Sequence, residues 1–435
     1  MTDTTHPELR VEDRLRPVPE RTRPRRRIGA ILLGTGLLLI ALNLRIAVAS
    51  VGPVLAMIQA DLHLSGTGAS LLTTIPVVAF GAFAFLAPAL AARFGIHRLL
   101  GVSILALVVG ITLRLQPSLF SLLAGTVIVG AAIAIGNVLM PAAIKHDFSH
   151  RAGLMMGLYT TALFIGAALA SGVTIPLVSL TGGDWRTALA LWAIPAGIAF
   201  IVWIPQALRS AKTRRAHEGV IDTRETASEP PFRAILTDPV ALAVTALMGL
   251  QSLSYYAALT WLPTFFQDHR MSAHTAGWML SYSAFPGIAA SLVSPTLARR
   301  ARPTWLPVAI SVALVAAALG GLLVDPTRLA YLWMTLLGLG QGALISLSLS
   351  YIVLRSPDTH HTGHVSTMAQ GFGYLVAGLG PLGLGALHHA TDGWTVPVVA
   401  LLALLPLQLV AGTLASRPRH VLAGRDAVVS PSPSR

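Results

Sequence analysis

Twelve apolar segments, most of them about 20 residues long, follow one another along the sequence. A helix rises about 1.5 Å per residue, so a segment of this length crosses the roughly 30 Å hydrocarbon layer of a bilayer. With 54% hydrophobic and 11% charged residues, the chain is also too apolar for an ordinary soluble protein. The sequence predicts an all-α membrane protein with twelve transmembrane helices, at residues 28–57, 69–92, 98–115, 119–144, 153–177, 185–204, 240–266, 275–297, 304–323, 327–354, 365–387 and 394–414.

The basic residues predict an orientation. Most of the 31 Lys and Arg residues lie in the two tails and in alternate loops, whereas the other loops contain only Arg114, Arg186, Arg270 and Arg328. Because basic loops stay in the cytoplasm, we expect a bacterial inner-membrane protein with both termini on the cytoplasmic side. Basic clusters between apolar runs also argue against nucleic acid as the partner of a chain with net charge +13.

The start of the chain fits a second interpretation as well. Arg25-Arg26-Arg27, the apolar run after it and Ala47-Val48-Ala49 resemble a cleavable secretory signal. Cleavage would leave eleven helices and would remove the repeat partner of the seventh.

An internal repeat indicates how the helices are arranged. Ser65–Arg93 aligns without a gap on Ser272–Arg300, which superposes Pro88 on Pro295. Two homologous halves follow, and parallel repeats of this kind place a substrate site at the midplane between them, reached alternately from each side. We expect a tail at residues 1–27, an N-terminal half at 28–205, a linker at 206–238, a C-terminal half at 239–415 and a tail at 416–435, with 1–20 and 421–435 disordered.

Arg45 is the one charged residue in the interior of the predicted helices. It lies roughly 25 Å of helix away from the Arg25-Arg26-Arg27 cluster and from Asp61. A guanidinium at that depth costs several kcal/mol unless it faces a wet cavity, a partner or a ligand, so Arg45 is a candidate substrate anchor. The alternative is a structural arginine that snorkels or bonds backbone carbonyls.

Five motifs carry a family resemblance. They are Ala41-Leu42-Asn43-Leu44-Arg45, Gly136-Asn137-Val138-Leu139-Met140-Pro141, Gly249-Leu250-Gln251-Ser252-Leu253, Gly338-Leu339-Gly340-Gln341-Gly342 and Met368-Ala369-Gln370-Gly371-Phe372-Gly373-Tyr374. In this order they resemble the major facilitator superfamily, and within it the branch of cyanate and 2-nitroimidazole transporters. The resemblance covers residues 30–415 and implies a secondary transporter that works by alternating access.

The loop between the second and third segments departs from the superfamily pattern Gly-x-Leu-Ala-Asp-Arg-x-Gly-Arg-Arg. Ala92 stands where the aspartate is expected, so Arg93 needs another partner in the cytoplasmic gate that the resemblance implies. Asp147 is a candidate by topology, and Lys145 completes the predicted gate. An Arg93 that only snorkels at a helix end is the alternative.

The substrate chemistry is predicted from what the segments lack. All 18 Asp and Glu residues and all 14 His residues fall in loops, tails or predicted helix ends. An unpaired buried cation is expensive, and a small anion would supply the missing charge with bidentate geometry. This favours a cyanate-like anion, in agreement with the resemblance; a neutral heterocycle such as 2-nitroimidazole, or export of a drug-like compound, is the alternative.

The same absence bears on energy coupling. Proton pumps usually carry an acid or a histidine at the midplane, and the predicted helix interiors have none. We therefore expect facilitated diffusion, exchange, or coupling carried by the substrate and Arg45.

Seven further residues are candidate substrate contacts: Asn43, Asn137, Gln251, Tyr255, Gln341, Gln370 and Tyr374. Gln251 shares a helix face with Tyr255, and Gln370 with Tyr374. Asn43 lies about 200° from Arg45 on a helical wheel, so both reach one cavity only if the helix is distorted. Packing hydrogen bonds between helices are the alternative for these side chains.

Other protein classes have weaker support. The chain has no Cys, which excludes disulfides, thiolate chemistry and Cys-ligated metals. His360, His361 and His364 have only Asp358 as an acidic neighbour, so no metal site and no cofactor is predicted. No motif such as His-Glu-x-x-His or Gly-x-Ser-x-Gly occurs, which argues against an enzyme. We expect a monomeric carrier in the lipid bilayer with a small-molecule substrate; a transporter-like receptor without flux is the alternative of another class.

Overall fold

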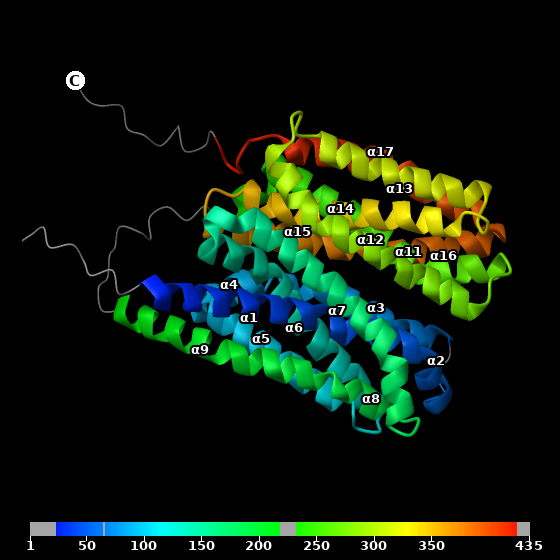
Figure 1. Cartoon of the computed structure of the whole chain (residues 1–435), viewed down its shortest axis with the longest axis horizontal. Helices are drawn as coiled ribbons and strands as arrows, with labels where there is room; N and C mark the ends of the chain where they lie inside the picture. The colour runs from blue at the N-terminus through cyan, green and yellow to red at the C-terminus, as the bar shows by residue number, and fades with distance from the viewer. Residues whose placement is uncertain (1–22, 64–65, 218–231, 424–435) are drawn as a thin grey trace, which may run out of the picture.

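The computed structural model describes residues 23–63, 66–217 and 232–423, and within these ranges it contains helices and no strand (Figure 1). The predicted disorder of residues 1–20 lies outside the described residues. The helices are α1 (Arg23–Ala49), α2 (Val51–Asp61), α3 (Gly66–Ala84), α4 (Ala87–Phe94), α5 (Ile96–Leu113), α6 (Leu119–Asp147), η3 (Ser149–Arg151), α7 (Ala152–Leu180), α8 (Trp185–Leu191), α9 (Ala193–His217), α10 (Phe232–Leu236), α11 (Pro239–Asp268), α12 (Ala273–Arg300), α13 (Leu306–Val324), α14 (Ala330–Leu354), α15 (Thr359–Ala377), α16 (Leu379–Thr391) and α17 (Thr395–Ser416).

Four of the predicted membrane crossings are broken into two helices each: α1–α2, α3–α4, α8–α9 and α15–α16. The second helix of each pair carries a proline in its first turn, at Pro53, Pro88, Pro195 and Pro381. Proline lacks a backbone N–H, which costs nothing in the first turn, because N–H groups there have no helical acceptor. Its ring would clash with a preceding helical turn, so the chain bends before it. The α3–α4 pair bends by 56°.

Twelve crossings result when each broken pair is counted once. Nine helical stretches of the described residues are long and apolar enough to cross a membrane, and the bent α3–α4 pair makes a tenth. The remaining two, α12 and α15–α16, are less apolar because they bury polar side chains inside the bundle. Ser291 on α12 and Ser366 and Gln370 on α15 are all completely buried.

Helices α1–α9 form one half of the bundle and α10–α17 form the other, side by side in Figure 1. Successive crossings run in opposite directions. We call the end that carries Arg93, Lys145, Arg299 and Arg355 the basic end, and the end that carries α2, α8 and α16 the distal end.

The halves meet through a limited set of helices. Helix α7 packs on α12 and α14, α15 packs on α3, α4 and α6, and α6 contacts α14. Small residues allow this close approach: a Cβ at Gly157 would lie 2.9 Å from the Leu292 carbonyl, and one at Gly81 would lie 2.6 Å from Leu375 Cγ. At the distal end, α2, α8 and α16 pack on helices of their own half. The contacts between the two halves, which we call the seam, therefore lie nearer the basic end than the distal end.

Two segments differ from the sequence-based expectations. Helix α9 continues through His217, beyond the predicted boundary at residue 205. The prediction that residues 421–435 are disordered is wrong for Val421 and Leu422, which are 2% and 7% exposed. Their backbone amides donate to the Arg355 carbonyl and to Asp238, so two apolar residues after the last helix close over the basic end.

The contact of α12 with α14 provides a test of the packing. A Cβ at Gly342 would overlap the backbone of Gly287, whereas a Cβ at Gly320 on α13 meets nothing within 4 Å. We expect Gly342→Ala to lower the free energy of unfolding by about 1–3 kcal/mol through overpacking. Gly320→Ala should be neutral or stabilising, because Ala is the better helix former. Thermal unfolding of the purified proteins in detergent measures both, and equal midpoints would contradict the packing.

Candidate functional site

Arg45 lies on α1, just before the break at Ser50, and joins the two halves. Its Nη1 atom donates a 2.8 Å hydrogen bond to the Tyr256 hydroxyl of α11. The guanidinium also lies 5.9 Å from the centroid of the Tyr256 ring. Arg45 is partly buried and Tyr256 is 5% exposed. The cation is therefore held between the halves, deep in the bundle.

Aromatic side chains surround this contact. The Tyr256 ring packs 5.4 Å from Tyr255 and 6.3 Å from Tyr374, and Tyr374 packs 5.4 Å from Phe80 of the other half. In the described part of the chain, the titratable side chains that interact with the charge of Arg45 are tyrosines and not carboxylates. A neutral phenol can accept a hydrogen bond from a guanidinium and donate one to a ligand. It does not cancel the positive charge.

A cavity of about 400 Å³ lies beside the tyrosine cluster and extends toward the distal end. Residues of α7, α11, α12 and α14 line it, among them Phe164, Tyr255, Trp278, Phe285 and Gln341. The Tyr255 ring thus belongs both to the cavity wall and to the group around Arg45. The wall is largely apolar and includes four aromatic side chains, with few polar groups, as in sites for small ligands.

Two of the predicted amide contacts have unused hydrogen-bonding capacity, and one of them, Gln341, lines this cavity. Gln341 lines the cavity and donates from Nε2 to Ser254 Oγ at 2.9 Å, while its Oε1 has no partner among the described residues. Gln251 is completely buried; its Oε1 accepts from Ser252, and its Nε2 has no partner in the described ranges. Buried polar atoms without partners are costly, so each amide would be stabilised by one further hydrogen-bond partner.

Gln370 and Asn137 join the halves directly. Gln370 Nε2 on α15 donates to the Asn137 carbonyl of α6 at 2.8 Å, and the neighbouring Ser366 hydroxyl donates to the Val138 carbonyl. The Asn137 side chain accepts from the Tyr159 hydroxyl at 3.2 Å. The structure therefore places these two residues, each predicted as a substrate contact, in the seam between the halves.

Asn43 points away from Arg45. Its Nδ2 donates to the carbonyls of Leu39 and of Pro195 at 2.8 and 3.2 Å. Pro195 lies in the first turn of α9. This side chain packs α1 on α9 within one half and takes no part in the geometry around Arg45.

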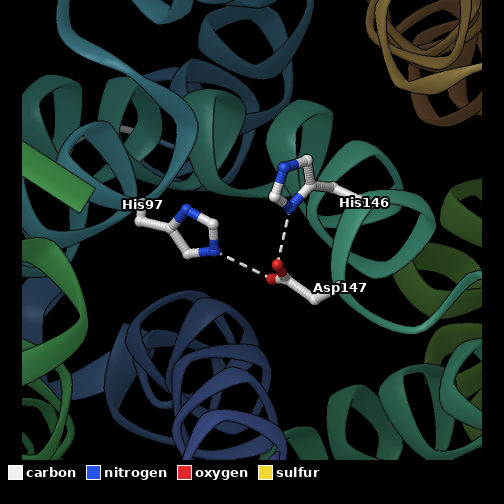
Figure 2. Close-up of side chains that lie close together, drawn as sticks. All are labelled: His97, His146 and Asp147. Carbon is white, nitrogen blue, oxygen red and sulfur yellow. Dashed lines mark hydrogen bonds and ion pairs between the residues drawn. The ribbon is translucent and has the colours of Figure 1, made fainter. Parts of the chain in front are cut away.

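The predicted gate residues have different environments at the basic end. Lys145 reaches across the seam and donates to the carbonyls of Val353 and Ser356, at 3.4 and 3.1 Å, where α14 ends. A cation is favoured at a helix C-terminus because the carbonyls there are unsatisfied. Asp147 is engaged within its own half by His97 and His146 (Figure 2).

Two further groups at this end bear on the gate. The Arg93 guanidinium lies 5.4 Å from the centroid of the Phe94 ring. Asp358, in the other half, interacts with the charge of Lys145. Partial burial opposes ionisation of Asp358, but hydrogen bonds from the backbone amide and ring of His361 hold the pKa of its carboxyl below the ordinary value. Asp358 is therefore charged at neutral pH.

Sequence reasoning missed Tyr256, which makes the contact with Arg45. It chose Tyr255 because that residue shares a helix face with Gln251. A usable signal was the tyrosines themselves: the chain has only 7, and Tyr159, Tyr255, Tyr256 and Tyr374 all interact with Arg45.

Comparison with known proteins agrees with this architecture. Residues 31–381 match the family model of the Major Facilitator Superfamily. The 2-nitroimidazole transporter of Escherichia coli (strain K12) is 32% identical over 391 residues, which is 90% of this chain and 97% of that protein. The cyanate transport protein CynX of the same organism is 31% identical over 360 residues, 82% of this chain and 90% of that protein. The proton:xylose symporter XylE bound to 6-bromo-6-deoxy-D-glucose superposes with a TM-score of 0.72 at 14% identity, over 92% of this chain and 99% of that chain.

The chain belongs to the Major Facilitator Superfamily. The predicted fold and the resemblance to the cyanate and 2-nitroimidazole transporters are confirmed, and the protein is a multi-pass membrane transporter.

The contact of Asn43 with α9 leads to a prediction. We expect Asn43→Ala to lower the free energy of unfolding by about 0.6 kcal/mol, and by at most about 1.7, as for other hydrogen bonds between membrane helices. Gln267→Ala is the matched control, because that amide is exposed and bonds only a carbonyl of its own helix. Thermal unfolding in detergent compares the two. A midpoint for Asn43→Ala equal to that of the control would show that the α1–α9 bond contributes nothing.

Proposed function

We propose that this protein is a secondary transporter that moves a small anion of the cyanate type across the bacterial inner membrane by alternating access, with Arg45 binding the anion. One observation carries the proposal: a guanidinium lies between the halves, and the described side chain that bonds it is the neutral phenol of Tyr256. A charge in this setting is stabilised best by an anion that enters the site. The cyanate transport protein among the relatives supports the same substrate class.

The neighbouring groups supply the remaining contacts. Nη1 of Arg45 donates to Tyr256, and the other guanidinium N–H groups form a planar fork suited to a small anion. The Tyr256 hydroxyl, having accepted from Arg45, can donate its own proton to the ligand. Gln251 has an unpaired amide nitrogen, a donor that suits an anion, whereas the unpaired atom of Gln341 on the cavity wall is the amide oxygen, an acceptor that suits a ligand carrying an N–H group. Because the anion would touch groups of both halves, its binding can favour their closure around it.

The basic end acts as the cytoplasmic gate in this proposal. With the termini in the cytoplasm, as the basic loops indicate, the cavity faces outward and the seam is closed on the inside. Lys145, Ser366 and Gln370 hold that seam by bonds to carbonyls of the opposite half. The bonds of Ser366 and Gln370 contribute on the order of 1 kcal/mol each and the charged bond of Lys145 about 1.5–3 kcal/mol, so the seam can open and close repeatedly. Since the described neighbours of Arg45 include no carboxylate, we propose facilitated diffusion or exchange rather than coupling through an acidic residue.

A second candidate substrate has its own support. The cavity wall carries Phe164, Tyr255, Trp278 and Phe285, and flat aromatic rings stack favourably on such side chains. The 2-nitroimidazole transporter among the relatives points to a neutral aromatic heterocycle. Import or export of such a compound through the same cavity would use the tyrosines and Gln341 more than the charge of Arg45.

Uptake of labelled cyanate into proteoliposomes tests the proposal. We expect Arg45→Ala to lower kcat/KM by at least about 30-fold, since removing a desolvated charge partner costs about 2 kcal/mol or more. Arg328→Ala is the control, because that arginine is exposed at the distal end.

Three outcomes would contradict it. Absence of flux for any substrate would indicate a receptor, and uptake indifferent to Arg45 would remove the anion mechanism. Competition by 2-nitroimidazole that persists in Arg45→Ala would favour the heterocycle.

The Lys145 contact leads to a prediction about the gate. We expect Lys145→Gln to open the seam more often, by about tenfold, because a hydrogen bond to a charged group contributes about 1.5–3 kcal/mol. The native chain has no Cys, so Ser366→Cys provides a single buried reporter in the seam. Its rate of reaction with a water-soluble maleimide should rise in the Lys145→Gln background. Arg151→Gln, which removes an exposed cation at the same end, should leave the rate unchanged. If the rate with Lys145→Gln equals the rate with the native Lys145, the proposed gate is contradicted.

A further inference from the structure

A second polar cluster lies at the basic end, within one half and away from Arg45. His97, in the first turn of α5, places its Nε2 atom 2.8 Å from Oδ2 of Asp147. His146, in the last turn of α6, places its Nδ1 atom 2.6 Å from Oδ1 of the same carboxylate. Figure 2 shows both rings directed at the Asp147 carboxylate, each at a different oxygen atom. The three potential ligand atoms lie within 4.8 Å of one another.

The donor set is typical of a transition-metal site. Two imidazole nitrogens and one carboxylate oxygen suit Zn²⁺, Co²⁺ or Ni²⁺, whereas Mg²⁺ and Ca²⁺ prefer oxygen ligands throughout. Three protein ligands leave a coordination position for water or an anion. The carboxylate would also offset one of the two positive charges of the ion at this basic end.

The cluster is both held in place and accessible. The side chains of Asp147 and His97 are 8% and 14% exposed, while that of His146 is 57% exposed. The His97 ring stacks on Trp203 of α9, at 5.9 Å and 20° between planes, and the Trp203 ring N–H donates to the His97 carbonyl at 2.7 Å. Such outer contacts fix the orientation of a ligating imidazole. Two ligands are therefore preorganised, and the third can close over an ion from the solvent side.

We propose that His97, His146 and Asp147 bind one divalent transition-metal ion. The ion would replace the hydrogen bonds that the carboxylate makes with the two rings. Asp147 follows two residues after Lys145, which bonds the end of α14 in the other half, so a bound ion would fix the α6 end from which that contact is made. The site goes beyond the sequence prediction of no metal, because His97 lies 50 residues before Asp147 in the chain.

Direct binding of Co²⁺ tests the proposal without any measurement of transport. The full chain, purified in detergent without a polyhistidine tag, is titrated with Co²⁺ and followed by visible absorption, which thiolates cannot produce because the chain has no Cys. We expect saturation at one ion per chain and competition by Zn²⁺. His146→Gln and Asp147→Asn should each weaken binding more than tenfold, since even loss of an outer partner of a metal site costs roughly 10–100-fold.

The control is His361→Gln. His361 Nδ1 lies 2.8 Å from Asp358 Oδ2, so the His361→Gln substitution removes a comparable histidine–aspartate pair at the same end. Its affinity for Co²⁺ should match the wild type. His146 is the decisive variant, because its exposed side chain can be replaced without disturbing the packing, and its unfolding midpoint without metal should stay unchanged. No absorption at one equivalent, or wild-type affinity in His146→Gln, would overturn the proposal.

Discussion

The uncancelled charge of Arg45 is the constraint on which the rest of the site depends. A guanidinium in the middle of a membrane protein needs polar neighbours, and here the nearest one, Tyr256, comes from the opposite half. The electrostatic energy of the Arg45 charge therefore depends on how the two halves are arranged. Any movement of α11 relative to α1 changes the surroundings of the cation, and any anion bound there changes the energy of that movement.

The seam between the halves is made of contacts that are individually modest. Glycine–backbone packing near Gly157 and Gly81, and hydrogen bonds from Lys145 and Gln370 to backbone carbonyls, require shape and polarity but little hydrophobic burial. Such contacts can be broken and remade at low cost inside a membrane, because lipid provides no strong drive to keep helices together. The broken helices add bends at fixed points. Prolines in the first turns of α2, α9 and α16 bend three crossings near the distal end, and the proline in the first turn of α4 bends one near the basic end.

The basic end concentrates further chemistry in a short stretch of α6. Lys145 faces the other half, whereas Asp147 turns toward His97 in its own half. Residues two apart on a helix point in different directions, so one helix end can serve both a contact between halves and a cluster within one half. His97 at the start of α5, together with His146 and Asp147 at the end of α6, brings three potential ligand atoms within 4.8 Å of one another.

The sequence by itself determined the number and order of the crossings, the two-fold repeat and the position of Arg45. These features depend on local runs of apolar residues and on the cost of a buried charge, which are readable without knowing any contact. Tertiary structure decided which side chains meet. Tyr255 and Tyr256 are adjacent and chemically alike, and only the packing of α11 on α1 selects Tyr256, 211 residues from Arg45. Likewise Asn43 bonds α9 and His97 bonds Asp147, because helical periodicity defines the faces of each helix but not the neighbour that each face will contact.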